Sequence, residues 1–492
     1  MAARNIKGMT LHAALQLGQL CHMKKSNGSH SIDDLQHYWM GVDYLFIDEV
    51  SMIGCELMAD ISDALNIAWK GPNATLPFGN LSIIFAGDFC QLPPIGVTKL
   101  YTNLDNITSH SADSQMEEGV KKLQGKFLWA SIEHVVQLEH SMRQCGLHNE
   151  QFRELLNHTQ FSNCTKEDII ILNGRLLGSA QVDLTEQEWR QAPIITAQNA
   201  MKDALNCITV TSFAALMQRE VVYYNARDHR GSTPIQNEEL KDWLLNLDSG
   251  ATKYLLGRLP LVEGMPVIIG ENYDINGGIV NGSNGFLKSV QFQEDDDGTC
   301  FATSAIVLVP DCSDDHLPHL DCHEVAILAE TVDIHKKNPS DGKMVKWKRQ
   351  QLPLQPGFAI TDYKAQGKTF SNVIIDLHSA RSAQSAYVML SCATSLEGLL
   401  VLRPFHSNQK KLMGHVSLDF RSDAARLQQL AQNTAQCVAT THKGGSSVHN
   451  DGRNLSSVFR FQHTTNFLFS KLLSVLYVSS GSAPGQAFFA WL

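Results

Sequence analysis

The sequence predicts an α/β protein with mostly parallel sheets and a smaller β domain. Short apolar runs typical of buried strands alternate with helical stretches, which is the pattern of parallel sheets covered by helices. One stretch in the second half instead carries short β-like pieces rich in Gly, Asn and Asp. The chain has 492 residues, 43% of them hydrophobic and 18% charged, so it has the size of two or three ordinary globular domains.

The predicted strands of the parallel sheets occur in both halves of the chain. They are Tyr44–Ile47, Leu81–Ala86, Val135–Leu138, Ile194–Thr196, Val373–Asp376 and Leu399–Leu402. The β-rich stretch is Val262–Pro353, in which Gly264–Gly270, Ile279–Leu287 and Ala305–Pro310 are predicted strands of a small barrel or hairpin domain. The acidic run Glu294–Asp297 is predicted to be a solvated turn between such strands.

Composition says more about the cellular compartment of the protein than about the molecules it binds. A formal net charge of -10 does not by itself indicate a nucleic-acid binder, although a local groove can hold a strand while the remaining surface is acidic. The 11 scattered cysteines include no Cys-x-x-Cys pair, which favours reduced thiols in a cytosolic or nuclear compartment. The N-terminus lacks the apolar core of a signal peptide, and Phe467–Val478 is too short to span a bilayer, so no membrane association is expected.

Two of the predicted strands end in acidic or amide residues. Asp48 and Glu49 follow the first of them, and Asp88 and Gln91 follow the second. The carboxyl ends of neighbouring parallel strands meet at one edge of a sheet. At such an edge Asp48 would hold Mg²⁺, Glu49 would polarise the attacking water, and Asp88 and Gln91 would lie beside the γ-phosphate. The alternative is two buried strands that merely have acidic ends.

The residues around these four positions also resemble a known family. Asp-Glu-Val-Ser-Met at 48–52 and Gly-Asp-Phe-Cys-Gln-Leu-Pro-Pro at 87–94 resemble the superfamily-one helicases, and within them the PIF-type and the related Helitron transposon helicases. The resemblance extends over most of residues 4–405. It implies two RecA-like parallel-sheet motor domains with a small β-barrel inserted in the second. The expected parts are a first motor domain at 1–145, a second at 146–261 and 354–405, the inserted β domain at 262–353, and a poorly ordered C-terminal extension at 406–492.

The resemblance implies a set of residues that contact single-stranded DNA. Thr10 is a plausible helix N-cap with His12 in the first turn, and Pro93 stiffens the loop that links the γ-phosphate to the nucleic-acid groove. Asn281 belongs to a Val-Asn-Gly element that helps to form the floor of the channel in the family, and Tyr363 could stack on a base. Taken alone, the same residues are typical of a helix cap, a proline turn and a hairpin.

Three further residues are assigned to the nucleotide by the resemblance. Arg143 corresponds to an arginine that reaches the γ-phosphate, although an isolated arginine is more often part of a surface ion pair. Lys364 and Gln366 match a Lys-x-Gln-Gly-x-Thr element that couples the nucleotide state to the grip on the strand. The tripeptide Gly-Lys-Thr at 367–369 is not a phosphate-binding loop, because Asp362 stands where that loop requires glycine.

The chain departs from the family pattern at two places. Cys392 stands where the family's last motif has an arginine directed at the γ-phosphate, and cysteine has neither the charge nor the reach of that side chain. The family's phosphate-binding loop lies upstream of Asp48, at a distance that would place it before Met1, so the first motor domain is expected to lack this loop. Both departures put ATP binding and catalysis by this chain in question.

The sequence therefore predicts an ATP-dependent 5′-to-3′ DNA helicase that uses ATP and Mg²⁺ and acts on single-stranded DNA and duplex junctions. A monomeric motor in the nucleus, or alternatively in mitochondria, is expected, with roles in DNA repair, recombination or telomere maintenance. The alternative is a catalytically defective helicase fragment or transposon remnant that at most binds single-stranded nucleic acid. A separate cluster, Cys312, His316, His319, Cys322 and His323, has spacing compatible with zinc but also with an ordinary polar loop.

Overall fold

The chain divides into two compact units, which the computed structural model describes over residues 8–17, 29–69, 76–108, 117–275, 277–313, 319–339, 342–406, 409–443, 475–478 and 486–491. The first unit contains the residues up to 165 together with those from 410 onward, and the second contains residues 166–409. The division thus falls after 165 and not at the expected position, 145. Helix α7 (Glu150–Gln160) belongs to the first unit, where the Gln160 amide donates to Asp88 at 3.5 Å.

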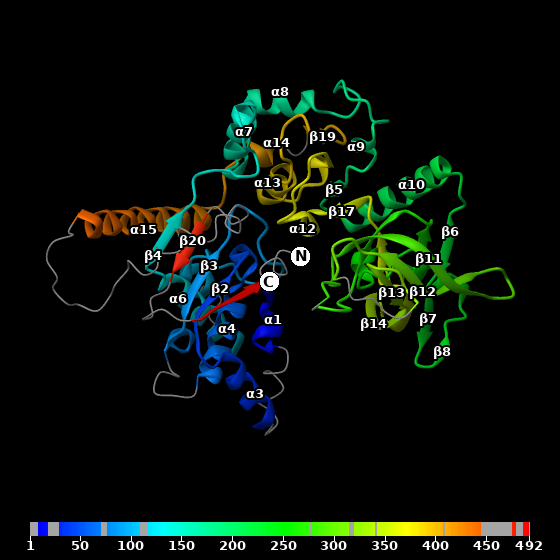
Figure 1. Ribbon diagram of the computed structural model, residues 1–492, viewed down its shortest axis with the longest axis horizontal. Coiled ribbons are helices and arrows are strands. Elements are labelled where there is room, and N and C mark those ends of the chain that lie inside the picture. The colour runs from blue at the N-terminus through cyan, green and yellow to red at the C-terminus, as the bar shows by residue number, and fades with distance from the viewer. Residues whose placement is uncertain are drawn as a thin grey trace. The chain divides into compact units, whose positions relative to one another are not determined.

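The first unit is built on a six-stranded sheet with the order β1-β21-β2-β3-β20-β4, of which β2, β3, β20 and β4 are labelled in Figure 1. Its strands are β1 (Met9–Thr10), β21 (Gln486–Trp491), β2 (Val42–Ile47), β3 (Ser82–Ala86), β20 (Val475–Val478) and β4 (His134–Gln137). Strands β1, β21, β2 and β3 pair in parallel, whereas β20 is antiparallel to both β3 and β4. The three strands predicted in this half are therefore present, with ends shifted by a residue or two.

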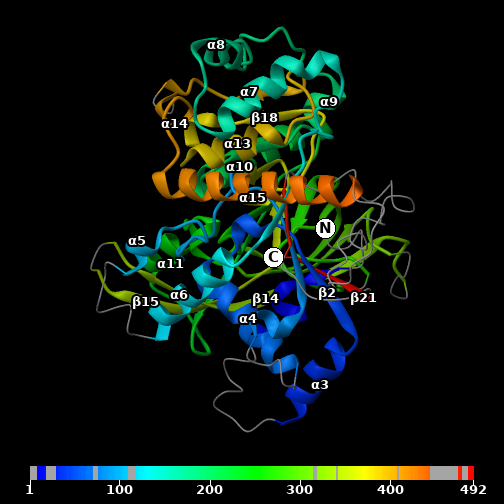
Figure 2. The same cartoon turned by 90° about the vertical axis from the view of Figure 1, so that its left-hand side faces the viewer.

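Helices cover this sheet and supply its core. They are α1 (Leu11–Ala14), α3 (Ser29–Trp39), α4 (Cys55–Ala68), α5 (Leu104–Thr108), α6 (Glu117–Ala130) and α7, with short 3-10 turns η2 (Val50–Met52), η3 (Pro77–Asn80) and η5 (Leu147–Asn149). Helix α4 buries Met58, Ile61 and Leu65 completely, at the spacing of one helix face. Helices α4 and α6 lie side by side (Figure 2). A Cβ at Gly125 of α6 would overlap the carbonyl of Cys55 in α4, so only glycine permits this close approach of the two helices.

The extension after the second unit was expected to be poorly ordered, but its described part forms secondary structure. It contains α14 (Gln409–Leu412) and the long helix α15 (Leu418–Lys443), which packs along β4 in the first unit (Figure 1). The Trp129 indole donates to Asp423 at 2.9 Å, and the Val135 amide donates to Thr434 at 3.1 Å. Phe420 packs edge-on against Tyr101 with ring centroids 5.4 Å apart. The inward residues recur at helical spacing, a pattern that was overlooked where the family resemblance faded.

The second unit contains a four-stranded sheet in which every pair is parallel. Its order is β17 (Ala359–Thr361), β5 (Ile194–Thr196), β18 (Val373–Ile375) and β19 (Leu399–Val401). Strands β5, β18 and β19 were predicted, but β17 was not, because three residues between a Pro-Gly turn and a helix carry little strand signal. The accompanying helices are α8 (Lys166–Gly174), α9 (Gln187–Arg190), α10 (Asn199–Met217), α12 (Asp362–Ala365) and α13 (Ala383–Ser391), with the turn η7 (Leu377–Ser379).

The β domain of this unit extends beyond the expected residues 262–353. Its seven-stranded, barrel-like sheet contains β16 (Leu354–Pro356), β10 (Pro266–Ile269), β11 (Asn284–Glu294), β12 (Cys300–Leu308), β6 (Val222–Asn225), β9 (Arg258–Leu261) and β13 (Glu324–Leu328). Strands β6, β9 and β16 lie outside the expected range. They were not predicted as part of this domain, because the strands with which they pair lie far from them in sequence. Strand β11 begins at Asn284, so residues from Ile279 to Ser283 form a loop and not the first half of a strand. The predicted acidic turn at 294–297 does join β11 to β12.

A smaller sheet completes the second unit. It contains β14 (Glu330–Lys337), β15 (Met344–Gln351), β7 (Arg227–Arg230) and β8 (Thr233–Pro234), next to helix α11 (Glu238–Leu245) and the turn η6 (Ser249–Ala251). Arg349 is fully buried and pairs with both carboxylate oxygens of Asp228, at 2.8 and 2.7 Å. The same guanidinium donates to the carbonyl of Leu244 at 2.8 Å, so this ion pair fastens α11 to the sheet.

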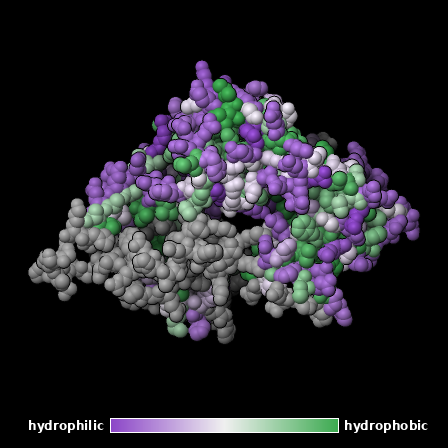
Figure 3. Space-filling view, turned by 45° about the horizontal axis from the view of Figure 1, so that its top comes forward, coloured by the Kyte–Doolittle hydropathy of each residue, from purple (hydrophilic) through white to green (hydrophobic). Residues whose placement is uncertain are grey.

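Hydrophilic residues dominate the face in Figure 3, and hydrophobic ones gather there only in small patches. Among the helices of the described residues, none combines the length and the apolar character that crossing a membrane requires.

Candidate functional site

The loops that follow β2 and β3 lie against each other. The parallel register pairs Ile47 with Phe85, so the two strands end at the same edge of the sheet. Gly87 has φ +148°, and a Cβ on it would lie 2.8 Å from the amide nitrogen of Val50. The pairing therefore brings Asp48 and Glu49 to the same edge as Asp88 and Gln91, as the strand pattern indicated.

Asp48 is buried at this edge without a complete set of partners. Its side chain is 4% exposed, and its Oδ1 atom has no hydrogen-bond partner within the described parts of the chain. Burial raises the pKa of the carboxyl to about 8, with the negative charge of Glu49 adding to the effect. A buried carboxylate oxygen of this kind is costly unless a cation neutralises it. The donor chemistry thus fits Mg²⁺, which prefers carboxylate oxygens as ligands.

Glu49 occupies an uncommon backbone conformation. Its φ and ψ are 56° and 44°, in the left-handed region that residues other than glycine rarely adopt. The residue precedes the turn η2, whose Met52 amide donates to the Glu49 carbonyl at 3.0 Å. Backbone strain of this kind concentrates at functional sites. The conformation turns the chain sharply between the metal-binding candidate and the buried Val50.

Asp88 is also buried, but both of its carboxylate oxygens accept hydrogen bonds from the protein. Its Oδ1 atom accepts from the Cys90 amide at 2.8 Å, and its Oδ2 atom accepts from the Gln160 amide group at 3.5 Å. The Gln91 amide nitrogen donates to the Asp88 carbonyl at 2.9 Å, which closes a tight turn. Through these contacts Asp88 stabilises the loop that contains Gln91. Contact between Asp88 and the γ-phosphate stays a prediction.

An aromatic cluster supports the same loop. Phe89 packs edge-on against Trp129 and Tyr101, with centroid distances of 5.1 and 5.9 Å. Tyr101 in turn contacts Phe420 of α15. The sequence reasoning missed this support, because the aromatic residues are scattered over the chain and only the fold brings them together.

Three first-unit residues were predicted to contact DNA: Thr10, His12 and Pro93. Thr10 caps α1 as predicted, with its hydroxyl accepting from the Ala13 amide at 3.4 Å. His12 is exposed on this helix, which is only four residues long. Pro93 is half-buried and leads into Ile95, which is 74% exposed at the tip of the loop.

Arg143, which was predicted to reach the γ-phosphate, lies in a bend beyond the end of β4. The strand ends at Gln137, and the intervening chain folds on itself. The Ser141 hydroxyl donates to the Gln144 side chain at 2.7 Å, and Arg153 donates to the Gln144 carbonyl at 2.8 Å. Arg143 is half-buried next to this bend.

In the second unit, three predicted residues fall on one short segment after β17. The Thr361 hydroxyl caps α12 by accepting from the main-chain amide of Lys364 at 3.4 Å. At the other end of the helix, the main-chain amide of Gln366 donates to the Asp362 carbonyl. Tyr363 and Lys364 lie between them. The Lys364 ammonium is 5.2 Å from the centroid of the Tyr254 ring, and burial lowers its pKa to about 8, assisted by Lys202 and Lys368.

Two remaining predictions concern Cys392 and Asn281. Cys392 is 1% exposed, and its thiol donates to the carbonyl of Ala365 at 3.2 Å, so it ties the end of α13 to α12. Asn281 is exposed in the loop between β10 and β11, where its amide donates to the Asn272 side chain at 2.8 Å.

The cysteine and histidine cluster was left open as a zinc site. His316 lies outside the described residues. Cys312 Sγ and His323 Nδ1 are 3.7 Å apart. Over the residues that the structure does describe, no three His, Cys, Asp or Glu side chains converge as metal ligands.

Comparisons with known proteins agree with the sequence patterns. The family model described as PIF1-like helicase matches residues 1–169. ATP-dependent DNA helicase PIF1 of Emericella nidulans is 26% identical over 466 residues, which cover 84% of this chain and 54% of that protein. The human protein of the same name is 26% identical over 409 residues, covering 82% of this chain and 53% of its own length. The chain thus spans about half the length of the curated relatives it matches.

Solved structures match in fold. The Pif1 helicase from Candida albicans superimposes with a TM-score of 0.57 at 22% identity, covering 87% of this chain and 86% of that one. A Bacteroides Pif1 helicase in complex with ADP-AlF3 and ssDNA gives a TM-score of 0.53 at 20% identity, covering 80% and 77%. The resemblance to PIF-type helicases drawn from residues 48–52 and 87–94 is therefore confirmed, and the chain is similar to the PIF1-like helicases over most of its length.

Proposed function

We propose that this chain acts as an ATP-dependent DNA helicase. The observation that carries the proposal is the edge formed by β2 and β3, where a buried, incompletely paired Asp48 and a strained Glu49 lie beside the Asp88–Gln91 loop. Such an arrangement suits a metal-assisted phosphoryl transfer to water. The similarity to proteins named as ATP-dependent DNA helicases supports the same assignment.

Each residue at the edge has a distinct part in this proposal. Asp48 holds Mg²⁺, which neutralises charge on the ATP phosphates when it is bound. Glu49 orients the attacking water and accepts its proton, and Gln91 senses the γ-phosphate from the turn that Asp88 organises. Arg143 stabilises the negative charge that develops on the phosphoryl group.

Strand binding is assigned to both units. Thr10, His12 and Pro93 contact single-stranded DNA from the first unit, and Asn281 and Tyr363 do so from the second. Lys364 and Gln366 connect strand binding to the state of the nucleotide. The Bacteroides structure with bound ssDNA supports this partner.

The finer parts of the proposal concern direction and setting. We place the enzyme on single strands and duplex junctions as a monomeric motor moving 5′ to 3′, in the nucleus or alternatively in mitochondria. Repair, recombination and telomere maintenance are the processes that need such a motor. Direction is tested by unwinding of substrates with either a 5′ or a 3′ single-stranded tail.

The central experiment measures ATP hydrolysis by the purified 492-residue chain with and without single-stranded DNA. We expect stimulation by DNA and a loss on the order of 10²–10⁴ in turnover for Glu49→Gln, the size of a general-base contribution. Glu117→Gln, an exposed glutamate on α6, is the matched control and should keep wild-type turnover. Turnover that survives Glu49→Gln, or is absent from the wild type, contradicts the proposal.

A second candidate is a chain that binds single-stranded nucleic acid without hydrolysing ATP. Cys392 favours it, because a buried thiol bonded to the Ala365 carbonyl leaves no arginine at that position to reach a phosphate. Strand binding without DNA-stimulated turnover would support this candidate over the first.

A further inference from the structure

The loop from Ser249 to Leu255 in the second unit presents an exposed aromatic side chain at the cost of backbone strain. Lys253 and Tyr254 are consecutive residues in the left-handed region, with φ of 51° and 66°. Residues other than glycine pay about 1 kcal/mol or more for this conformation. The Tyr254 side chain is nevertheless 42% exposed, so burial of its ring does not compensate the strain.

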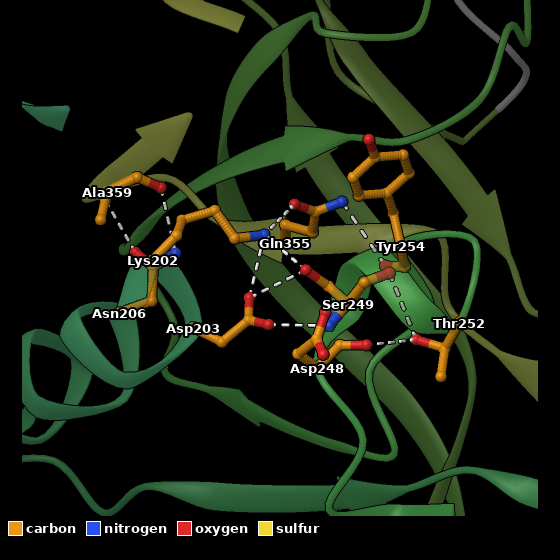
Figure 4. Close-up of polar contacts among 9 residues, drawn as sticks. All are labelled: Lys202, Asp203, Asn206, Asp248, Ser249, Thr252, Tyr254, Gln355 and Ala359. Atoms are coloured by element: carbon orange, nitrogen blue, oxygen red, sulfur yellow. Dashed lines mark hydrogen bonds and ion pairs between the residues drawn. The ribbon is translucent and has the colours of Figure 1, made fainter. Parts of the chain in front are cut away.

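A buried ion pair holds the start of this loop (Figure 4). The Lys202 ammonium, on a residue 2% exposed, contacts Asp203 at 2.9 Å and donates to the side chains of Ser249 at 2.9 Å and Gln355 at 2.8 Å. Asp203 accepts from the Ser249 amide at 2.8 Å and from its hydroxyl at 3.1 Å. The network joins α10, η6 and β16, and it fixes Ser249 on both its main chain and its side chain.

The main chain of Tyr254 is anchored to the same network. Its amide donates to the Ser249 carbonyl at 2.8 Å, and its carbonyl accepts from the Gln355 side chain at 3.4 Å. In Figure 4 the ring points away from the Lys202–Asp203 pair. The network therefore determines where the ring projects without itself using the ring.

Positive charge gathers beside the ring. The Lys364 ammonium lies 5.2 Å from the ring centroid, within the range of a cation–π contact. Burial lowers the pKa of Lys364, and Lys202 and Lys368 lower it further. Of these two lysines, Lys202 is itself paired with Asp203. An aromatic face next to a half-buried, positively charged group offers a surface for a base and for the phosphate attached to it.

We propose that Tyr254 is a base-stacking residue for single-stranded DNA and that Lys364 receives the neighbouring phosphate. This inference rests on the proposed function in that it requires the chain to bind single strands. It adds Tyr254, which was not predicted from sequence, and it gives Lys364 a contact with the strand itself. Stacking on a tyrosine face tolerates any base, as a translocating motor requires. The strained loop then has a function, because it holds the ring in the position at which a base arrives.

The test compares strand binding by Tyr254→Asn, Tyr254→Phe and the wild-type chain. Asparagine tolerates the left-handed conformation, so Tyr254→Asn removes the ring while the loop keeps its shape. Fluorescence anisotropy is measured with a thymidine oligonucleotide and with an abasic oligonucleotide of equal length and charge. We expect Tyr254→Asn to weaken thymidine binding about tenfold and Tyr254→Phe to bind within about twofold of wild type. On the abasic strand, Tyr254→Asn and wild type should bind equally.

Tyr223→Thr is the matched control, because Tyr223 is 45% exposed on β6 and threonine suits a strand. It should bind both oligonucleotides as the wild type does. Equal binding of the thymidine strand by Tyr254→Asn and wild type overturns the stacking role, as does an equal loss on both oligonucleotides. A wild-type chain that binds neither oligonucleotide overturns the proposed function itself.

Discussion

Both parallel sheets place a buried aspartate where a strand ends, and the two aspartates differ in their partners. Asp376, after β18 in the second unit, accepts from Arg403 on both oxygens, at 2.8 and 2.9 Å, and from the Thr196 hydroxyl at 3.3 Å. Asp48, after β2 in the first unit, has an oxygen for which the described residues supply no donor. A carboxylate with its own arginine holds a sheet edge together, whereas one without a complete set of partners suits a ligand.

The comparison extends to positive charge. Lys364 in the second unit is half-buried, and its charged neighbours are lysines, so it is the counterpart of Asp48 with the opposite sign. In our proposals, Asp48 belongs to a cation site in the first unit and Lys364 to an anion site in the second. Four experiments test this distinction.

Removing the guanidinium of the compensated pair should have the largest effect. Arg403→Ala leaves the fully buried Asp376 without its main partner, and we expect a loss of about 3 kcal/mol in the free energy of unfolding. Urea denaturation followed by circular dichroism measures it. Arg190→Ala, at an exposed position on α9, should lose less than about 0.5 kcal/mol. Equal effects of the two substitutions would mean that Asp376 needs no partner.

The uncompensated aspartate should respond in the opposite direction. Burial raises the pKa of Asp48 from 3.8 to about 8, so near neutral pH folding must protonate this carboxyl, which opposes folding. Asp48→Asn removes that cost, so in buffer with EDTA at about pH 7 we expect the free energy of unfolding to rise by about 2 kcal/mol. Asp60→Asn on α4 is a useful control, because Asp60 is ion-paired with Lys121 at 2.6 Å and should not gain stability. A destabilised Asp48→Asn chain would show that the carboxylate is satisfied in the metal-free protein.

Magnesium should stabilise the wild type through Asp48. At a concentration tenfold above its dissociation constant, Mg²⁺ adds about 1.4 kcal/mol to the free energy of unfolding. We expect a rise in Tm with Mg²⁺ for the wild type and no rise for Asp48→Asn, measured by differential scanning fluorimetry. An equal rise in both proteins would place the cation elsewhere.

The smallest effect should be a pH dependence of strand binding. The pKa of Lys364 is lowered from 10.5 to about 8, so its ammonium loses its charge as the pH rises through 8, and affinity for single-stranded DNA should fall about fivefold, or about 1 kcal/mol. The groups that face it are Lys202, Lys368 and the Tyr254 ring. Folding responds with the opposite sign. Between pH 8 and 10.5 the unfolded chain binds the extra proton, so this group's contribution to stability rises with pH.

Lys364→Arg separates this titration from other effects. Arginine stays charged over the whole range, so the affinity of this variant should not change between pH 7 and 9. A parallel decline in wild type and Lys364→Arg would assign the pH dependence to another group.

The sequence predicted the features that depend on residues adjacent in the chain, such as the bounds of strands. Strand β5 has the predicted bounds, and β2 and β18 differ from theirs by a residue or two, because apolar runs bounded by turn residues are typical of buried strands. The approach of the loops containing Asp48 and Asp88 followed from parallel pairing alone. Partners that lie far apart in the chain could not be predicted. Asp419 accepts from the Asn103 side chain at 2.8 Å across 316 residues, and no short pattern connects the two positions.

The same limit applies to the loop that carries Tyr254. Its strain comes from main-chain angles, and its anchor is a lysine that reads in sequence as part of the helix α10. Nothing in the residues around Tyr254 distinguishes it from an ordinary surface tyrosine. The charge states of Asp48 and Lys364 were likewise beyond sequence, because burial by distant segments determines them.

The return of α15 to the first unit has a consequence for synthesis on the ribosome. The second unit is one continuous segment, whereas the first is interrupted by it and receives Phe420 and Asp423 only after residue 409. Chains are usually taken to fold in order of their emergence, N-terminal domain first. Here the later-encoded unit can finish first. The earlier-encoded sheet must wait, with Trp129 and Tyr101 uncovered, until the helix that covers them has left the exit tunnel.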